Sequence, residues 1–154
     1  MARISIYLCR SCGYYQTGGK PRLKGGEMSN VKVTERGWVG HFILSHRCSF
    51  RRNTLIQGPR DAVIVSTVGD MRGKDGVGVE EIGCNRYYET MAFGVSKNGP
   101  YLDADVTEER SFDSPWCINA DKPDDLPLEV DNVANDMHEA VVREFVDKME
   151  KEQL

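Results

Sequence analysis

The side chains of this 154-residue chain that could do chemistry gather in one basic stretch. No acidic residue lies between Glu35 and Asp61, so the positive charge there has no local partner. Guanidinium groups bind phosphates through paired hydrogen bonds, and an aromatic ring can stack on a nucleotide base. One interpretation is therefore a site for a nucleotide-like or phosphorylated anion, built from Trp38, His41, His46, Arg47, Arg51, Arg52, Arg60 and Tyr88.

Two charges on predicted strands give a narrower hypothesis. Alternation along residues 48–56 places Arg52 on the apolar side of that strand, and alternation along 86–95 places Glu89 on the apolar side of its own. A charge on an apolar strand face must be paired or must line a cavity. The simplest inference is an Arg52–Glu89 ion pair, which either fixes strand register only or faces a ligand.

The same residues allow acid–base chemistry, because an Arg, a Glu and a Tyr together with His41 can move protons. No G-x-S-x-G motif marks a serine nucleophile, so the catalytic residues stay unassigned. Cys9 and Cys12 make half of a zinc ribbon, and no second C-x-x-C pair exists. We expect neither a metal nor a cofactor.

The charge distribution limits the class of partner. Residues 1–60 hold 11 Lys/Arg and two acids, whereas residues 61–154 hold nine Lys/Arg and 22 acids. Such asymmetry marks a basic binding face, or basic strands that pair with the acidic remainder of the same fold. An isoelectric point of about 5.4 argues against duplex nucleic acid. No apolar run approaches the roughly 18 residues of a membrane helix, and no signal peptide is found, so we expect a cytoplasmic protein without membrane contact.

The first 27 residues do not look like part of the fold. Glycines and a proline interrupt them, and no hydrophobic period emerges. Residues 24–28, Lys-Gly-Gly-Glu-Met, can be back-translated into a bacterial ribosome-binding sequence followed by a start codon. We interpret 1–27 as a translated leader or a disordered arm, and 28–154 as a single domain.

Hydrophobic patterns after residue 30 predict an antiparallel sheet of five or six strands. Alternating or β-branched runs are found at 31–34, 38–44, 48–56, 62–68, 86–95 and 101–106. Short turns between successive strands favour a meander over parallel crossovers. The run at 62–68 is continuous enough for a central strand buried on both faces, the glycine-rich 69–78 reads as a loop, and 113–129 reads as an irregular crossing.

The last segment predicts one long amphipathic helix over residues 130–149. Apolar residues recur there at i, i+3, i+4 and i+7, and Asp131 or Asn132 is a candidate N-cap. A helix packed on one face of an antiparallel sheet gives an α+β fold. Because one helix leaves the other face of the sheet uncovered, we expect a homodimer.

Several segments carry a family resemblance: RGWVGHFILSHRCSFRRNTLI, IVSTVGDMR, GCNRYYETMAF, YLDADV and FDSPW. Over residues 31 to about 145 the chain resembles a family of uncharacterised phage and prophage proteins. That resemblance implies a small accessory protein in a bacterial or phage intracellular setting, and it implies no activity and no site residue.

These observations favour a non-enzymatic binding protein that engages a host protein or a small anionic ligand. The alternative is a small enzyme acting on a phosphorylated or nucleotide substrate through Arg52, Glu89, Tyr88 and His41. A purely structural oligomer is the third possibility. The candidate ligand-binding residues are Trp38, His41, Arg51, Arg52, Tyr88 and Glu89.

Overall fold

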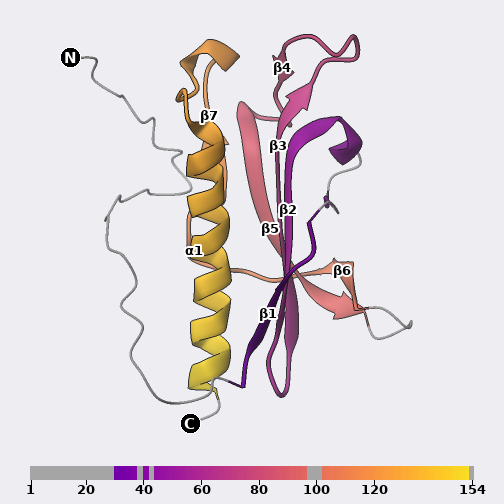
Figure 1. Cartoon of the computed structure of the whole chain (residues 1–154), viewed down its shortest axis with the longest axis vertical. Coiled ribbons are helices and arrows are strands. Elements are labelled where there is room, and N and C mark those ends of the chain that lie inside the picture. Colours follow the sequence, from indigo (N-terminus) through magenta and orange to yellow (C-terminus); the bar gives the residue numbers. More distant parts are fainter. Residues whose placement is uncertain (1–29, 38–39, 42–43, 97–101, 153–154) are drawn as a thin grey trace, which may run out of the picture.

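A computed structural model of the chain describes residues 30–37, 40–41, 44–96 and 102–152. It confirms the α+β fold: an antiparallel sheet with one long C-terminal helix along one of its faces (Figure 1). The proposed leader and the predicted turn at 98–100 lie outside the described residues.

Five strands form the main path of the sheet in the order β1-β2-β3-β5-β6, and every neighbouring pair is antiparallel. Two short strands join at its margins, where β4 pairs with the end of β3 and β7 pairs with β5. The strands are β1 (Lys32–Glu35), β2 (Cys48–Gln57), β3 (Ala62–Arg72), β4 (Val79–Glu80), β5 (Arg86–Ser96), β6 (Asp103–Glu109) and β7 (Cys117–Asn119).

β3 is the central strand that its β-branched sequence predicts. Residues 63–69 are all buried, and the strand is paired along its length with β2 on one side and β5 on the other. The predicted loop at 69–78 is wrong in its first half, because β3 continues to Arg72. Gly69 lies in the strand, paired with Phe50 and Tyr88, and glycine is required there because a Cβ would lie 2.0 Å from the ring of Tyr88.

The helix α1 (Val130–Lys151) covers one face of the sheet, hereafter the helix side. Its buried apolar residues pack on the end of β2, the start of β3 and on β5, in a core of Ile56, Val63, Val65, Ala92, Val141, Val142, Phe145 and Met149. The predicted cap is wrong, since Glu129 holds the N-cap position and no side chain caps the helix. Asp131 lies in the first turn and accepts a hydrogen bond of 2.7 Å from the Tyr88 hydroxyl.

The opposite face, hereafter the far side, also buries apolar residues. Ile64, Val68 and Phe93 are each at most 3% exposed, although α1 does not cover them. The residues before β2 contribute to this cover: Leu44 packs on a cluster that includes Val68, and a 3-10 helix occupies Ser45–Arg47. The expected strand at 38–44 is therefore not formed at Gly40, His41 or Leu44, and the rest of that range lies outside the described residues.

No helix in the described part of the chain is both long and apolar enough to cross a membrane.

Candidate functional site

The sheet register separates the two charges that the sequence paired. Arg52 lies opposite Thr67, which lies opposite Thr90, so these three side chains share the helix side. Glu89 precedes Thr90 and therefore points to the far side. The Arg52–Glu89 ion pair is wrong: alternation shows which residues of one strand share a face, but not which faces of two strands coincide.

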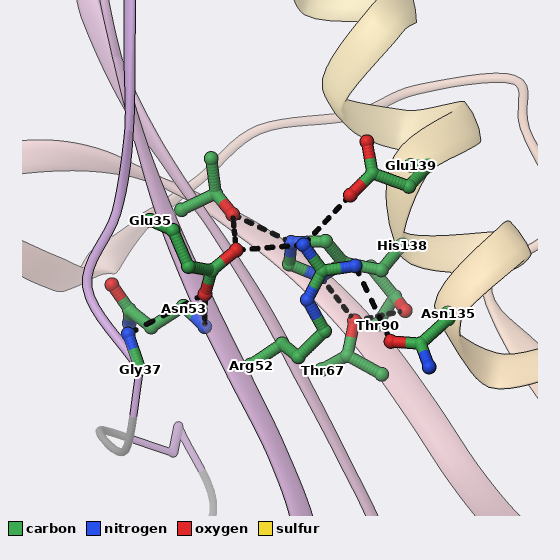
Figure 2. Close-up of polar contacts among 10 residues, drawn as sticks. Glu35, Gly37, Arg52, Asn53, Thr67, Thr90, Asn135, His138 and Glu139 are labelled. Atoms are coloured by element: carbon green, nitrogen blue, oxygen red, sulfur yellow. Dashed lines mark hydrogen bonds and ion pairs between the residues drawn. The ribbon is translucent and has the colours of Figure 1, made fainter. Parts of the chain in front are cut away.

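On the helix side, Arg52 joins three elements. Its guanidinium lies 2.7 Å from Glu35 of β1 and 2.7 Å from Glu139 of α1, and it donates to Asn135 at 3.4 Å (Figure 2). Partial burial acts to raise the pKa of Glu35, but hydrogen bonds from Arg52 and Thr54 outweigh it and the pKa is lowered. We name this group the Arg52 cluster: Glu35, Arg52, Asn135 and Glu139.

Below the Arg52 cluster lies a histidine with no exposed surface. His138 Nε2 lies 2.7 Å from the hydroxyl of Thr54, and its Nδ1 lies 2.7 Å from that of Thr67. Thr67 in turn contacts Thr90 at 2.7 Å, as Figure 2 shows. Burial, together with the charge of Arg52, lowers the pKa of His138 to about 4, so the imidazole is neutral near pH 7.

The hydrogen bonds fix the tautomer of His138. An ionised Glu35 can only accept hydrogen bonds, so the Thr54 hydroxyl donates its single proton to Glu35 Oε2 at 2.9 Å. Thr54 must then accept from His138 Nε2–H, which leaves Nδ1 to accept from the hydroxyl of Thr67. The donors of Thr54, His138, Thr67 and Thr90 are thus satisfied internally, and this group connects α1 to the sheet.

On the far side, His41 and Glu89 meet. His41 Nε2 lies 3.3 Å from Glu89 Oε1, and Arg86 Nε lies 2.7 Å from the other carboxylate oxygen. The side chains of His41 and Glu89 are only 4% and 10% exposed. Burial acts to raise the pKa of Glu89, yet the hydrogen bond with His41 and the charge of Arg86 outweigh it and the pKa is lowered. An ionised carboxylate therefore orients the imidazole.

A pocket of about 170 Å³ opens beside this imidazole. Two of its lining residues hold a buried polar atom, His41 Nδ1 and Ser66 Oγ, that has no hydrogen-bond partner within the described residues. Leaving a buried polar atom unpaired costs about 1–3 kcal/mol. The pocket is lined by Arg36, Gly40, His41, Asn53, Ile64, Ser66, Phe93, Asp103, Ala104 and Val106.

Gly40 places His41 at this pocket. A Cβ on Gly40 would lie 2.5 Å from Cβ of Ser45 and 2.9 Å from Cγ1 of Val68, so only glycine lets the chain come this close to β3. The His41 ring then contacts Phe93, with ring centroids 5.8 Å apart. The unpaired Nδ1 is thus held by backbone packing on one side and by a carboxylate on the other.

The other predicted site residues lie elsewhere. Arg51 is opposite Val68 and outside the pocket lining. Tyr88 belongs to the helix side, where burial and Asp131 raise the pKa of its phenol. Trp38 lies outside the described residues. Of the candidate residues, the structure brings together His41 and Glu89 on the far side.

Sequence reasoning missed Ser66, Arg36 and Asn53. The signal for Ser66 was present, because a hydroxyl inside the continuous apolar run of a central strand needs a partner on one of the two faces. Arg36 and Asn53 carry no local signal, since they reach the pocket through the pairing of β1 with β2. Among the described residues, no three His, Cys, Asp or Glu side chains are grouped as metal ligands would be.

No protein-family model, curated protein or solved structure matches this chain. The resemblance to phage and prophage proteins therefore stays a prediction, and the function has to be argued from the pocket itself.

Proposed function

We propose that this protein binds a small neutral molecule carrying a hydroxyl or N–H group, in the pocket beside His41. The observation that carries the proposal is a pair of buried, unpartnered polar atoms, His41 Nδ1 and Ser66 Oγ, that belong to two residues lining one cavity. Both atoms are buried without ligand, so a ligand that displaces the groups over them and bonds both would remove two desolvation penalties of about 1–3 kcal/mol each.

The volume of the pocket restricts the size of the ligand. A cavity of roughly 150 Å³ accommodates benzene, whereas sites for drug-sized ligands span about 300–1,000 Å³. At about 170 Å³, this pocket holds one ring or a short branched chain. A nucleotide would leave most of its atoms outside, which argues against the nucleotide ligand expected from the sequence.

The lining restricts the charge of the ligand. The guanidinium of Arg36 is paired with Asp103 at 3.6 Å, and the carboxylate of Glu89 lies behind His41. An anion would meet one neutralised cation and a nearby negative charge, so a neutral ligand is favoured. Ile64, Phe93 and Val106 supply apolar contacts for a ring.

The hydrogen-bond roles complete the chemistry. When Nε2–H of His41 donates to Glu89 and the imidazole carries no second proton, Nδ1 has a lone pair and accepts. The hydroxyl of Ser66 can donate. A ligand hydroxyl would give its proton to Nδ1 and accept from Ser66, and phenol is the simplest molecule with this group on a ring of suitable size.

The test compares phenol with toluene in a titration followed by amide nuclear magnetic resonance. Phenol is expected to shift the amides of β3 and β5 around the pocket, and to bind about tenfold more tightly than toluene, which lacks the hydroxyl. His41→Ala should remove that preference, while His46→Ala, at an exposed histidine outside the pocket, should keep it. Equal binding of the two ligands, or shifts away from the pocket, would overturn the proposal.

A further inference from the structure

We propose that Arg36 closes the pocket, and that a ligand enters or leaves only while the Arg36 side chain is released from β6. The inference rests on the proposed function, since it describes how the ligand of that pocket is admitted. Its basis is that Arg36, at one edge of the sheet, bonds the opposite edge across the rim of the cavity. We call this contact the Arg36 latch: Arg36, Leu102 and Asp103.

The residues that line the pocket divide into a buried floor and an exposed rim. The floor lies on the central strands, where Ile64, Ser66 and Phe93 are each at most 3% exposed. The rim includes Asp103 of β6, which is exposed, and Arg36, which is partly exposed. A ligand that comes from solvent therefore passes the rim before it meets the floor.

The two sides of the latch belong to opposite edges of the sheet. Arg36 directly follows β1, and its backbone N–H donates to the carbonyl of Asn53 on β2 at 2.6 Å. Asp103 begins β6, at the other end of the order β1-β2-β3-β5-β6. In a flat sheet, four strand spacings would separate these edges by roughly 19 Å, farther than one side chain reaches. The sheet therefore curls toward its far side, where a register shift between Phe93 and Gly94 marks the bend.

The bonds of the latch are of a kind that opens easily. Arg36 Nη1 donates to the backbone carbonyl of Leu102, and Nη2 lies 3.6 Å from the carboxylate of Asp103. The side chains of Arg36 and Asp103 are 28% and 73% exposed, and an ion pair this exposed is weak and is screened by salt. Because β2 holds the backbone of Arg36, the latch opens by rotation of one side chain.

A weak latch makes the open pocket a minor but populated state. An open fraction of about one in ten slows exchange of a ligand about tenfold relative to a pocket without the latch, and tenfold corresponds to about 1.4 kcal/mol. The latch can close again over a ligand that fits the cavity, so it affects entry and exit equally. It therefore controls the rates of binding and leaves the affinity nearly unchanged.

The test places a thiol on the pocket floor with Ser66→Cys in the full chain. Its reaction with methyl methanethiosulfonate, a small neutral reagent, is followed by mass spectrometry of peptides. Adding Arg36→Ala should speed this reaction about tenfold. Arg47→Ala is the matched control, because Arg47 likewise bonds one backbone carbonyl and one carboxylate but lies outside the pocket lining. A salt concentration of about 1 M should speed labelling of Ser66→Cys and leave the variant that also lacks Arg36 unchanged.

Two further measurements exclude other causes of faster labelling. Asp103→Asn keeps the size of the side chain and removes the ion pair, so it should speed labelling about threefold. It removes a negative charge near the thiol, whereas Arg36→Ala removes a positive one, so faster labelling in both variants reports access and not the thiolate fraction. Cys48 is 1% exposed, packs with Val68 on the far side and lies outside the pocket lining. Labelling of Cys48 that rises together with that of the introduced thiol would overturn the latch, because it would mean that the whole face opens.

The phenol titration separates failure of the latch from failure of the proposed function. Equal labelling with and without Arg36→Ala overturns the latch, whether or not phenol binds. Faster labelling in a protein that does not bind phenol supports the latch and overturns the proposed function. Where phenol binds, Arg36→Ala should raise its association and dissociation rates by the same factor and keep its dissociation constant within about twofold. A dissociation constant that changes as much as the rates would contradict the latch.

Discussion

The fold explains the small size of Ser66 but not its hydroxyl group. It lies in the central strand, where a small β-compatible side chain suffices for the fold, yet it lines the pocket and holds a buried hydroxyl with no partner among the described residues. A residue kept for stability alone would be apolar here, because burying an unpaired hydroxyl opposes folding. The stability of variants at this position therefore reports on whether the hydroxyl serves a ligand.

We predict that Ser66→Ala stabilises the protein without ligand. Removing an unpaired buried hydroxyl should raise the free energy of unfolding by about 1 kcal/mol and the melting temperature by about 2–4 °C. Urea and thermal unfolding would measure both, with Ser49→Ala expected to stay within about 0.5 kcal/mol of wild type. A less stable Ser66→Ala protein would mean that the hydroxyl is already satisfied.

At the scale of elements, the Arg52 cluster connects the edge strand β1 to α1. Two carboxylates, Glu35 and Glu139, share one guanidinium, which a planar group with five N–H donors can satisfy. β1 has four residues and, within the part of the chain that the structure describes, pairs with β2 alone, so this cluster supplies much of what fixes its end.

We predict that Arg52→Lys loosens β1. An ammonium is a point charge and cannot bond both carboxylates and Asn135 with the geometry of the fork. Hydrogen exchange of the β1 amides should quicken by about tenfold, equivalent to about 1.4 kcal/mol of local stability, while the amides of β3 keep their protection. Arg60→Lys, at an exposed residue, is the control. Unchanged exchange in β1 would show that the cluster does not hold this strand.

The long elements were predictable because each has a local cause. Alternation over ten or more residues specifies β2 and β5, β-branched continuity specifies β3, and the 3.6-residue period specifies α1. β4 and β7 have two and three residues and exist only because a longer strand lies beside them. No local pattern encodes such a pairing.

The site was only half predictable. Alternation correctly grouped Glu89 with the apolar residues of its strand, and His41 was a candidate for its chemistry alone. Which strand faces coincide depends on register, and register depends on the turns and on contacts such as the Tyr88 ring over Gly69. That is why Arg52 was assigned the wrong partner and why Ser66 was overlooked.

At the scale of the whole molecule, the uneven charge is partly resolved within the fold. Three arginines of the basic first 60 residues pair with acids of the remainder: Arg36 with Asp103, Arg47 with Glu80, and Arg52 with Glu139. These contacts support the interpretation that basic strands pair with the acidic remainder of the same fold. They also neutralise part of the positive charge that a basic binding face, the other interpretation of the sequence, would need.

Stability should fall in two steps as the pH is lowered. The folded pKa of His138, about 4, lies below its ordinary value near 6.5, so the unfolded chain binds the proton first. Between pH 6.5 and 4 this should cost on the order of 3 kcal/mol. The pKa of Glu144 is lowered to about 2, chiefly by Lys148 and Ser114 against the effect of burial, so its contribution is lost from about pH 4.5 downward.

Urea unfolding at a series of pH values measures this profile. His138→Gln should remove the first step and leave the second, because glutamine does not titrate. A variant that retains the same loss of stability between pH 6.5 and 4.5 would contradict the assignment of that step to His138.

The homodimer expected from the sequence stays a prediction. It was expected because one helix leaves the other sheet face uncovered, but Ile64, Val68 and Phe93 on that far side are already buried within one chain. Light scattering on the eluting protein would establish the dimer if it gives twice the mass of one chain.

The hydrogen-bond series from Glu35 through Thr54, His138 and Thr67 to Thr90 has a direction, and that direction is set from its outer end. When Glu35 gains a proton, it becomes a donor, and each group behind it can reverse its role in turn. The buried imidazole would then carry its proton on Nδ1 in place of Nε2. The protonation state of the half-exposed Glu35 therefore determines which ring nitrogen of the fully buried His138 carries the proton.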